Sequence, residues 1–350
     1  MTTLKKRLAL TVAATAMVLS MGAQAKTLTA EGPNPGTTNL TTLLAMAELA
    51  GAQGLADFQI QDGQTLTNSL VNVAEGSSDL ATVPLVAPFL LSRGAGPYAA
   101  IGKERGTELI GQVSALFTLS FGAIGLYSYD SSSVTGWDTF EGKRIINGPP
   151  SGGALANARA MIQISAGLED GKGYEGVQTN WGQMVKAISD GSGDAAVLPI
   201  YFPDDRMTRS AAAGSMTMYS IPKDIYEGES FQRFLAGPGK VGFEIPVTEL
   251  PQQEGITIQT EDGIWRGPQS AGAVVVSASM DFDTAKALTA LVLENLKMIE
   301  EKAPYMRFAR IGVIDEAGSG MCGPNPINYH PGAVAAWEEA GYTVPDCAKP

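Results

Sequence analysis

The sequence predicts an α/β protein built from two lobes of similar plan. Two observations predict this class: a stretch near the N-terminus recurs in the middle of the chain, and in each copy β-prone runs alternate with helical runs. Strands that alternate with helices are typical of parallel sheets covered by helices. We therefore expect one helix-covered sheet in each lobe.

The internal repeat rests on three anchors at nearly constant spacing. Residues 76–84 (GSSDLATVP) match residues 191–199 (GSGDAAVLP), residues 32–36 (GPNPG) match 148–152 (GPPSG), and Ala50-Gly51 matches Ala166-Gly167. Asp79 and Asp194 hold equivalent positions just before the third strand of each copy. This equivalence favours a shared structural role for the two carboxylates over catalysis.

Each copy has the same order of elements. The expected ranges are strands at 26–30 and 143–147, first helices at 40–51 and 155–167, second helices at 66–74 and 181–189, and third strands after positions 79 and 194. Both first helices end in glycine, as helix C-termini often do.

Two apolar runs flank the second copy, at residues 121–127 and 272–277, and we expect them to cross between the lobes. The predicted division is therefore 26–124 plus 272–350 for the first lobe and 125–271 for the second. Residues 283–302 have helical periodicity and should pack back on the first lobe. The segment 222–267 is rich in Gly, Pro and polar residues, and no element is predicted there.

The N-terminus has the pattern of a secretory signal peptide. A basic start at Lys5, Lys6 and Arg7 precedes an apolar run to Met21, and Ala23-Gln24-Ala25 supplies a small-x-small cleavage site. The run is shorter than the roughly 20 residues of a membrane-spanning helix. We expect residues 1–25 to be removed after Ala25, and the mature chain to be periplasmic and not inserted in the membrane.

Removing the three basic residues takes the formal net charge from −12 to −15. So acidic a chain is a poor partner for nucleic acid or an anionic membrane surface. Cys322 and Cys347 are its two cysteines, and an oxidising compartment would let them pair as a disulfide.

Candidate binding residues lie in loops that follow predicted strands, where α/β proteins bind ligands. Helix N-termini in such loops bind anions through free backbone N–H groups. Because the glycines admit close backbone approach and the polar side chains can donate, we expect a small anionic solute to contact these residues: Asn34, Thr37, Thr38, Gly63, Gln64, Thr65, Asn68, Pro150, Ser151, Gly152 and Gly153. Four arginines (Arg93, Arg159, Arg206 and Arg266) could pair with it, and spacing does not select among them.

Catalytic and metal-binding patterns are absent from the sequence. It has neither a nucleophile elbow, nor a phosphate loop, nor a cluster of His and Cys with metal-ligand spacing. The sole histidine, His330, precedes a predicted C-terminal helix and is expected to be structural or capping. The sequence predicts a chain that is not an enzyme and needs no cofactor or metal.

Two motifs resemble the TAXI family, the solute receptors of tripartite ATP-independent periplasmic (TRAP) transporters. They are FEGKRIINGPPSGG at 140–153 and INYHPGA at 327–333, the latter followed by Glu338, Glu339 and Gly341. The resemblance implies a type II periplasmic binding fold, in which two lobes joined by crossing strands close on a solute. It also implies a membrane permease as partner, and solutes such as glutamate, glutamine or 2-oxo dicarboxylates.

By position, the resemblance adds Tyr201 and Phe202 as cleft residues. The first loop departs from the glycine-rich family pattern, and the strand entering the second lobe carries the apolar run 121–125 where the family has a polar histidine. These departures favour a monocarboxylate or another small organic acid at least as much as a dicarboxylic amino acid. The alternatives are a receptor for an ABC or tripartite tricarboxylate importer, and a periplasmic sensory or enzymatic module. A monomer is expected.

Overall fold

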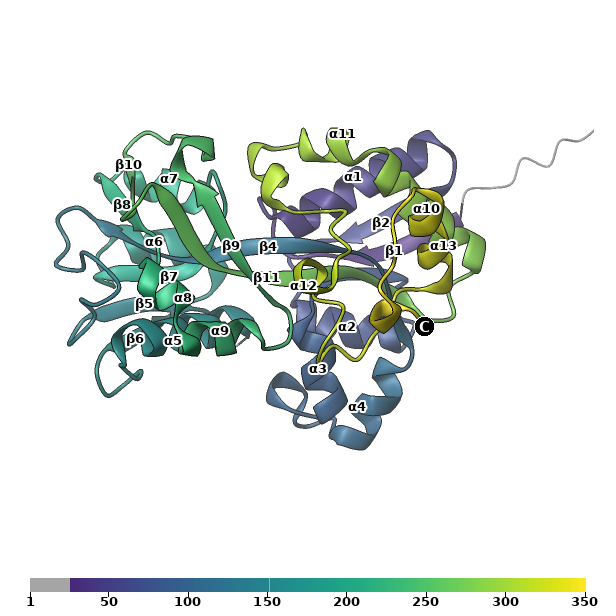
Figure 1. Ribbon diagram of the computed structural model, residues 1–350, viewed down its shortest axis with the longest axis horizontal. Helices are drawn as coiled ribbons and strands as arrows, with labels where there is room; N and C mark the ends of the chain where they lie inside the picture. Colours follow the sequence, from purple (N-terminus) through teal and green to yellow (C-terminus); the bar gives the residue numbers. More distant parts are fainter. Residues whose placement is uncertain (1–25, 151) are drawn as a thin grey trace, which may run out of the picture.

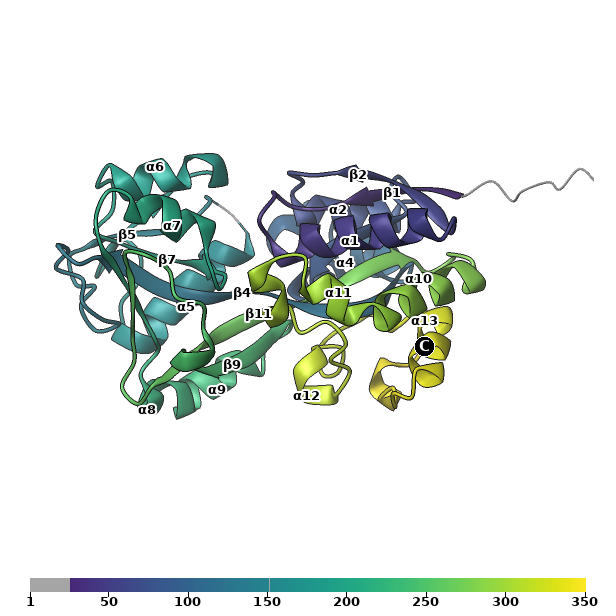
Figure 2. The same cartoon turned by 90° about the horizontal axis from the view of Figure 1, so that it is seen from above.

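The computed structural model describes residues 26–150 and 152–350. The predicted signal peptide and Ser151 lie outside these residues. Figures 1 and 2 show two lobes, with the long strands β4 and β11 running between them. The predicted α/β class is confirmed.

The first lobe starts with two βα units and a third strand, and then adds two helices. Its elements are β1 (Lys26–Glu31), α1 (Thr38–Ala52), β2 (Ala56–Gln61), α2 (Leu66–Ala74), β3 (Leu80–Pro84), α3 (Val86–Arg93), a 3₁₀ turn (Gly96–Tyr98) and α4 (Lys103–Ile110). β4 (Val113–Tyr129) then crosses to the second lobe.

The second lobe repeats the order and extends it. Its elements are β5 (Arg144–Gly148), α5 (Gly153–Ala166), β6 (Glu175–Gln178), a 3₁₀ turn η2 (Trp181–Gln183), α6 (Met184–Ser189), β7 (Ala195–Ile200), α7 (Asp205–Ala211), β8 (Met216–Tyr219), α8 (Lys223–Glu227), α9 (Glu229–Leu235), β9 (Lys240–Pro246), a 3₁₀ turn (Val247–Glu249) and β10 (Ile256–Gln259). β11 (Ile264–Ser277) returns to the first lobe.

The C-terminal part packs on the first lobe. It comprises α10 (Phe282–Glu294), α11 (Leu296–Glu300), the 3₁₀ turn η4 (Pro304–Phe308), α12 (Glu316–Ser319), α13 (Pro331–Glu339) and a last 3₁₀ turn (Asp346–Ala348). The single helix predicted at 283–302 is wrong in one respect: it is two helices, α10 and α11, that meet at Asn295. The Asn295 side chain donates to the Leu291 carbonyl at 2.8 Å, at the break.

The strand order is β2-β1-β3-β11-β4-β7-β5-β6, and it shows the internal repeat in three dimensions. β1 pairs in parallel with β2 and β3, and β5 pairs in parallel with β6 and β7. β3 then meets β11 antiparallel, just as β7 meets β4 antiparallel. Each lobe therefore places three parallel strands beside a crossing strand.

The two matched aspartates have equivalent structural roles, as predicted. Asp79 accepts from the Thr29 backbone N–H at 2.8 Å, and Asp194 accepts from the Arg144 backbone N–H at 2.8 Å. In both cases the partner lies 50 residues earlier, on the neighbouring first strand of the copy. Each carboxylate ties the start of a third strand to the first strand of its copy.

Residues 222–267, for which no element was predicted, are ordered around an antiparallel pair. β9 runs along β11, from Lys240 opposite Ser270 to Pro246 opposite Ile264. β11 therefore pairs with β9 of the second lobe along its first half and with β3 of the first lobe along its second half. The lobe boundaries given above, 26–124 plus 272–350 and 125–271, stay a prediction.

Candidate functional site

Two loops of the first lobe lie together at the carboxyl ends of its strands. The Gly63 N–H donates to the Pro33 carbonyl at 3.2 Å, and the Gln64 N–H donates to the Gly32 carbonyl at 3.0 Å. These bonds join the β1–α1 loop to the β2–α2 loop. The structure therefore brings Asn34, Thr37, Gly63 and Gln64 together, with Thr65 and Asn68 on the following turn.

The threonines of the first loop have local partners. The Thr37 hydroxyl donates to the Asn34 carbonyl at 3.0 Å and caps α1 by accepting from the Leu40 N–H at 3.4 Å. Thr38 is 2% exposed, and its hydroxyl donates to the Ser120 carbonyl on β4 at 3.0 Å. Thr38 thus fastens the start of α1 to the crossing strand, whereas Thr37 stays partly exposed.

In the second lobe, the loop between β5 and α5 is open to solvent. Pro150, Gly152 and Gly153 are exposed, and Gly148 and Gly152 have φ angles of +116° and +101°, which side chains rarely adopt. No side chain of the described residues caps α5, and the first N–H groups of a helix have no partner within the helix itself. The Thr179 N–H donates to the Gly148 carbonyl at 3.1 Å and brings the loop after β6 alongside.

The remaining two predicted cleft residues pack against the first lobe. The ring of Tyr201 lies 5.8 Å from that of Tyr305, and the ring of Phe202 lies 5.6 Å from that of Phe308. Both partners belong to η4 of the first lobe. Burial raises the pKa of Tyr201 to about 12, so it stays a neutral hydroxyl.

Phe202 is enclosed on the side of the second lobe as well. It is 2% exposed and packs edge-on against Trp265, at 5.0 Å between ring centroids, and stacks on Phe243 at 5.9 Å. In this arrangement the aromatic ring joins the lobes, and little of it is free for a solute. All predicted ligand contacts, including those of Ser151 outside the described residues, stay predictions.

The Asp205 carboxylate of the second lobe lies close to the β1–α1 loop of the first lobe. A Cβ on Gly36 of the β1–α1 loop would lie only 3.4 Å from an oxygen of Asp205, the first residue of α7. Gly36 has a φ of +80°, so the loop needs glycine there for its backbone conformation. The negative charge of Asp205 disfavours an anion beside Gly36.

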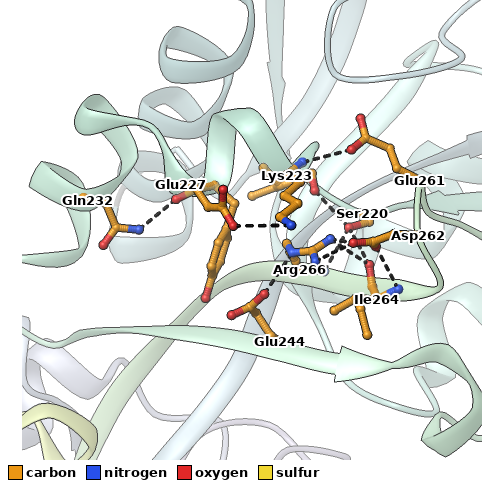
Figure 3. Close-up of polar contacts among 11 residues, drawn as sticks. Ser220, Lys223, Glu227, Gln232, Glu244, Glu261, Asp262, Ile264 and Arg266 are labelled. Atoms are coloured by element: carbon orange, nitrogen blue, oxygen red, sulfur yellow. Dashed lines mark hydrogen bonds and ion pairs between the residues drawn. The ribbon is translucent and has the colours of Figure 1, made fainter.

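Of the four arginines considered from the sequence, Arg266 has its charge fully paired (Figure 3). Its guanidinium donates to both oxygens of Asp262 at 2.9 and 2.8 Å and to Glu244 at 2.9 Å, and its side chain is 6% exposed. This geometry holds the pKa of Arg266 above its usual value and lowers that of Asp262 to about 2. Arg266 fastens β11 to β9 and is not available to a solute.

The other three arginines also have partners. Arg206 pairs with Asp204 at 3.0 Å and donates to the Pro199 carbonyl, and Arg159 pairs with Asp170 at 2.6 Å. Arg93 lies over the Phe89 ring at 4.8 Å. The sequence does not reveal these pairings, because the partners come together only in the fold.

Sequence reasoning missed Trp181 as a candidate site residue. Trp137, Trp265 and Trp337 are at most 2% exposed, whereas Trp181 is 36% exposed at the turn after β6. Its ring is covered on one side by the Arg206 guanidinium, 5.3 Å from the ring centroid. A signal was present, since the repeat aligns this tryptophan with Leu66, the residue that follows the candidate Thr65.

His330 confirms the structural role expected for it. It is 3% exposed, and its Nδ1 accepts from the Gly332 N–H at 3.2 Å at the start of α13. Burial lowers its pKa, which favours the neutral ring needed to accept this bond.

A shallow cavity of about 210 Å³ lies on the first lobe, beside the start of α1. Its lining is mostly apolar and includes Leu44, which is 51% exposed, together with Pro35, Gly36, Leu40, Thr41, Ile60 and Asp62.

Within residues 26–150 and 152–350, His, Cys, Asp and Glu side chains form no group of three suited to a metal ion. Over the same ranges, every helix is too short or too polar to span a bilayer.

Comparison with known proteins gives matches to solved structures only. No protein-family model matches the chain, and no curated protein matches it. A TRAP periplasmic solute-binding protein from Rhodobacter sphaeroides is 16% identical over 90% of this chain and 92% of its own, with a TM-score of 0.44. The periplasmic nitrate-binding protein NrtA from Synechocystis PCC 6803 is 12% identical over 81% and 68%, with a TM-score of 0.46.

A third similar structure, a TRAP solute-binding protein from Sulfitobacter sp. NAS-14.1 with bound β-D-galacturonate, is 12% identical over 90% of this chain and 92% of its own, with a TM-score of 0.42. The structural neighbours thus include periplasmic solute-binding proteins of TRAP and ABC transporters. These likenesses are remote and do not determine a solute. The fold class rests on the strand order and the crossing strands described above.

Proposed function

We propose that this chain is the exported solute-binding subunit of a TRAP transporter of the TAXI type, which captures a small organic anion and delivers it to a membrane permease. The observation that carries the proposal is the pair of equivalent loops, after β1 and after β5, at the carboxyl ends of two lobes that are joined by β4 and β11. A solute bound between such lobes shifts an open–closed equilibrium by hinge bending at the crossing strands.

The proposed chemistry of recognition is that of backbone N–H groups and hydroxyls. No side chain of the described residues caps the start of α5, and the N–H groups and positive dipole end of a helix N-terminus favour a carboxylate. The apolar crossing strand and the aromatic rings of Tyr201 and Trp181 would suit a hydrophobic part of the solute. A monocarboxylate or another small organic acid fits this combination.

Calorimetric titration with a panel of monocarboxylates, dicarboxylates, amino acids, neutral sugars and metal cations tests the proposed ligand class. Binding confined to organic acids is expected. Binding confined to sugars or cations would refute it. Small-angle scattering with the acid that binds should show a smaller radius of gyration, because closure brings the lobes together.

The resemblance of the motifs at 140–153 and 327–333 favours a TRAP permease over an ABC importer. Uptake assays distinguish the two kinds of transporter when the membrane vesicles contain the permease that this chain serves. Transport that needs an ion gradient and persists without ATP supports the TRAP assignment, and transport that requires ATP hydrolysis supports an ABC importer.

A further inference from the structure

Lys240 stands at the junction of the two lobes. It is the first residue of β9, and the glycine before it touches the first lobe: a Cβ on Gly239 would lie 2.6 Å from the nitrogen of Val86 and 3.0 Å from the carbonyl carbon of Leu85. Leu85 and Val86 lie where β3 ends and α3 begins, at the carboxyl edge of the first sheet. Figure 1 shows one end of β9 beside the first lobe.

The ammonium of Lys240 has no acidic partner within residues 26–150 and 152–350. Lys223, Lys286 and Lys302 each pair with a glutamate, at 3.8, 2.6 and 2.6 Å, but no carboxylate oxygen of these ranges lies within 4.0 Å of the Lys240 Nζ. The Nζ instead lies 3.4 Å from the centroid of the Phe234 ring on α9. In a chain with so large an excess of acidic residues, a half-buried lysine without a counter-charge calls for an explanation.

Polar groups that could share a ligand with Lys240 lie on the neighbouring strand and helix. Ser270 is its cross-strand partner on β11, and the Asn157 side chain of α5 donates to the Ser270 hydroxyl at 3.3 Å. Asn157 is on the second turn of α5, so Lys240 and the open β5–α5 loop face the same junction from two elements. The groups that the structure places beside Lys240 are the Phe234 ring, Gly237 and, across the strand pair, Ser270, and these three do not titrate.

Burial disfavours the positive charge of Lys240. Burial lowers the pKa of Lys240 to about 8, which means that the surroundings disfavour the charged form. The face of the Phe234 ring offsets part of that cost. An arriving anion would restore the missing counter-charge at a place where solvent is partly excluded, and both the attraction and the hydrogen bond are strengthened there.

We propose that Lys240 binds the anionic group of the solute, a carboxylate or another small oxyanion, between the lobes. This inference rests on the proposed function and names the residue that selects the charge of the ligand. Three of the arginines considered from the sequence, Arg159, Arg206 and Arg266, are already ion-paired, whereas Lys240 has no acidic partner among the described residues.

Acetate serves as a probe, because it is the smallest group that a carboxylate subsite must accept. At about pH 7, sodium acetate should raise the unfolding temperature of the wild type above that in sodium chloride of equal ionic strength. The shift should vanish in Lys240→Met and persist in Lys240→Arg and in Lys103→Met, a matched loss of an exposed lysine that makes no ion pair in the described residues. An equal shift in Lys240→Met, or none in the wild type, would overturn the inference.

The pH dependence gives a second readout that a merely structural lysine would not change. Above about pH 8 the free lysine loses its proton, so apparent acetate affinity should fall by up to about tenfold per pH unit. In Lys240→Arg the profile should be flat, because arginine keeps its charge. An equally steep fall in Lys240→Arg would contradict the inference.

The two proposals fail in distinguishable ways. If the calorimetric panel finds an organic acid and Lys240→Met binds it as tightly as the wild type, the inference about Lys240 is wrong and the proposed function stands. A loss of about 10- to 150-fold, the range for a hydrogen bond to a charged group, supports both. If no organic acid binds the wild type, the proposed function itself fails.

Discussion

Removing the disulfide between Cys322 and Cys347 should destabilise the chain by a predictable amount. The two cysteines are bonded in the structure, with a sequence separation of 25 and a Cα–Cα distance of 5.5 Å. For a closed loop of that length, the chain-entropy relation gives about 3.5 kcal/mol at 25 °C, because the cross-link restricts the unfolded chain. The double variant Cys322→Ser with Cys347→Ser should therefore lose about that much stability.

The tail should stay folded in this variant, because its other contacts remain. Trp337 is fully buried and donates to the Leu116 carbonyl at 3.0 Å, and the Tyr329 N–H donates to the Ala348 carbonyl at 2.9 Å. Cys347 is exposed and Cys322 partly so, and serine is tolerated at such positions. The loss should therefore come from the unfolded state, with little change in structure.

Urea unfolding, followed through near-ultraviolet circular dichroism, measures the difference. The oxidised wild type should be more stable than the double variant by about 3.5 kcal/mol, and reductant should bring the wild type to the level of the variant while leaving the variant unchanged. A difference below about 1 kcal/mol, or two reactive thiols in denatured, unreduced protein from the periplasm, would show that the Cys322–Cys347 bond does not stabilise the chain as expected.

Four further predictions concern the junction. If closure covers Trp181, the one exposed tryptophan of the described residues, adding the bound acid should shift its emission to the blue, and Trp181→Phe should remove the shift. Phe308→Ala should lower the free energy of unfolding by about 3–5 kcal/mol, since Phe308 packs on the rings of Phe202 and Phe243 of the second lobe, whereas an effect below about 1 kcal/mol would contradict that packing. Ser151→Ala should weaken solute binding by about 1.5–3 kcal/mol without unfolding the chain, and wild-type affinity in calorimetry would exclude the contact. Between about pH 8 and the usual lysine pKa of 10.5, the unfolded state binds more protons at Lys240 than the folded state, so stability should rise with pH in the wild type and this rise should be absent in Lys240→Met.

The repeated part of the fold was predictable because local signals agree there. Glycine anchors, apolar strands and helical periodicity recur in both copies, and α2 occupies the predicted range 66–74. The segment 222–267 was missed because its Gly, Pro and polar residues indicated a loop. Its strands do carry apolar alternation, at Val241, Phe243 and Ile245 in β9 and at Ile256 and Ile258 in β10, and they pair with β11 and β8.

The candidate site was predictable only in part, for a related reason. Loops after strands can be located from the order of elements, and the structure does bring the loops around Asn34 and Gly63 together. Whether a charged side chain is already paired depends on contacts between distant segments, such as Arg266 with Glu244. For the same reason Lys240 could not be distinguished from the other lysines by sequence.

Native mass spectrometry of the protein purified from the periplasm without denaturation tests the capture of a small organic anion most directly. We expect a mature chain that begins at Lys26 and carries one small organic acid, which denaturation releases and which rebinds after dialysis. A bound neutral sugar or cation, or a chain that remains free of any ligand after incubation with the panel of organic acids, would exclude the proposed capture of an organic anion.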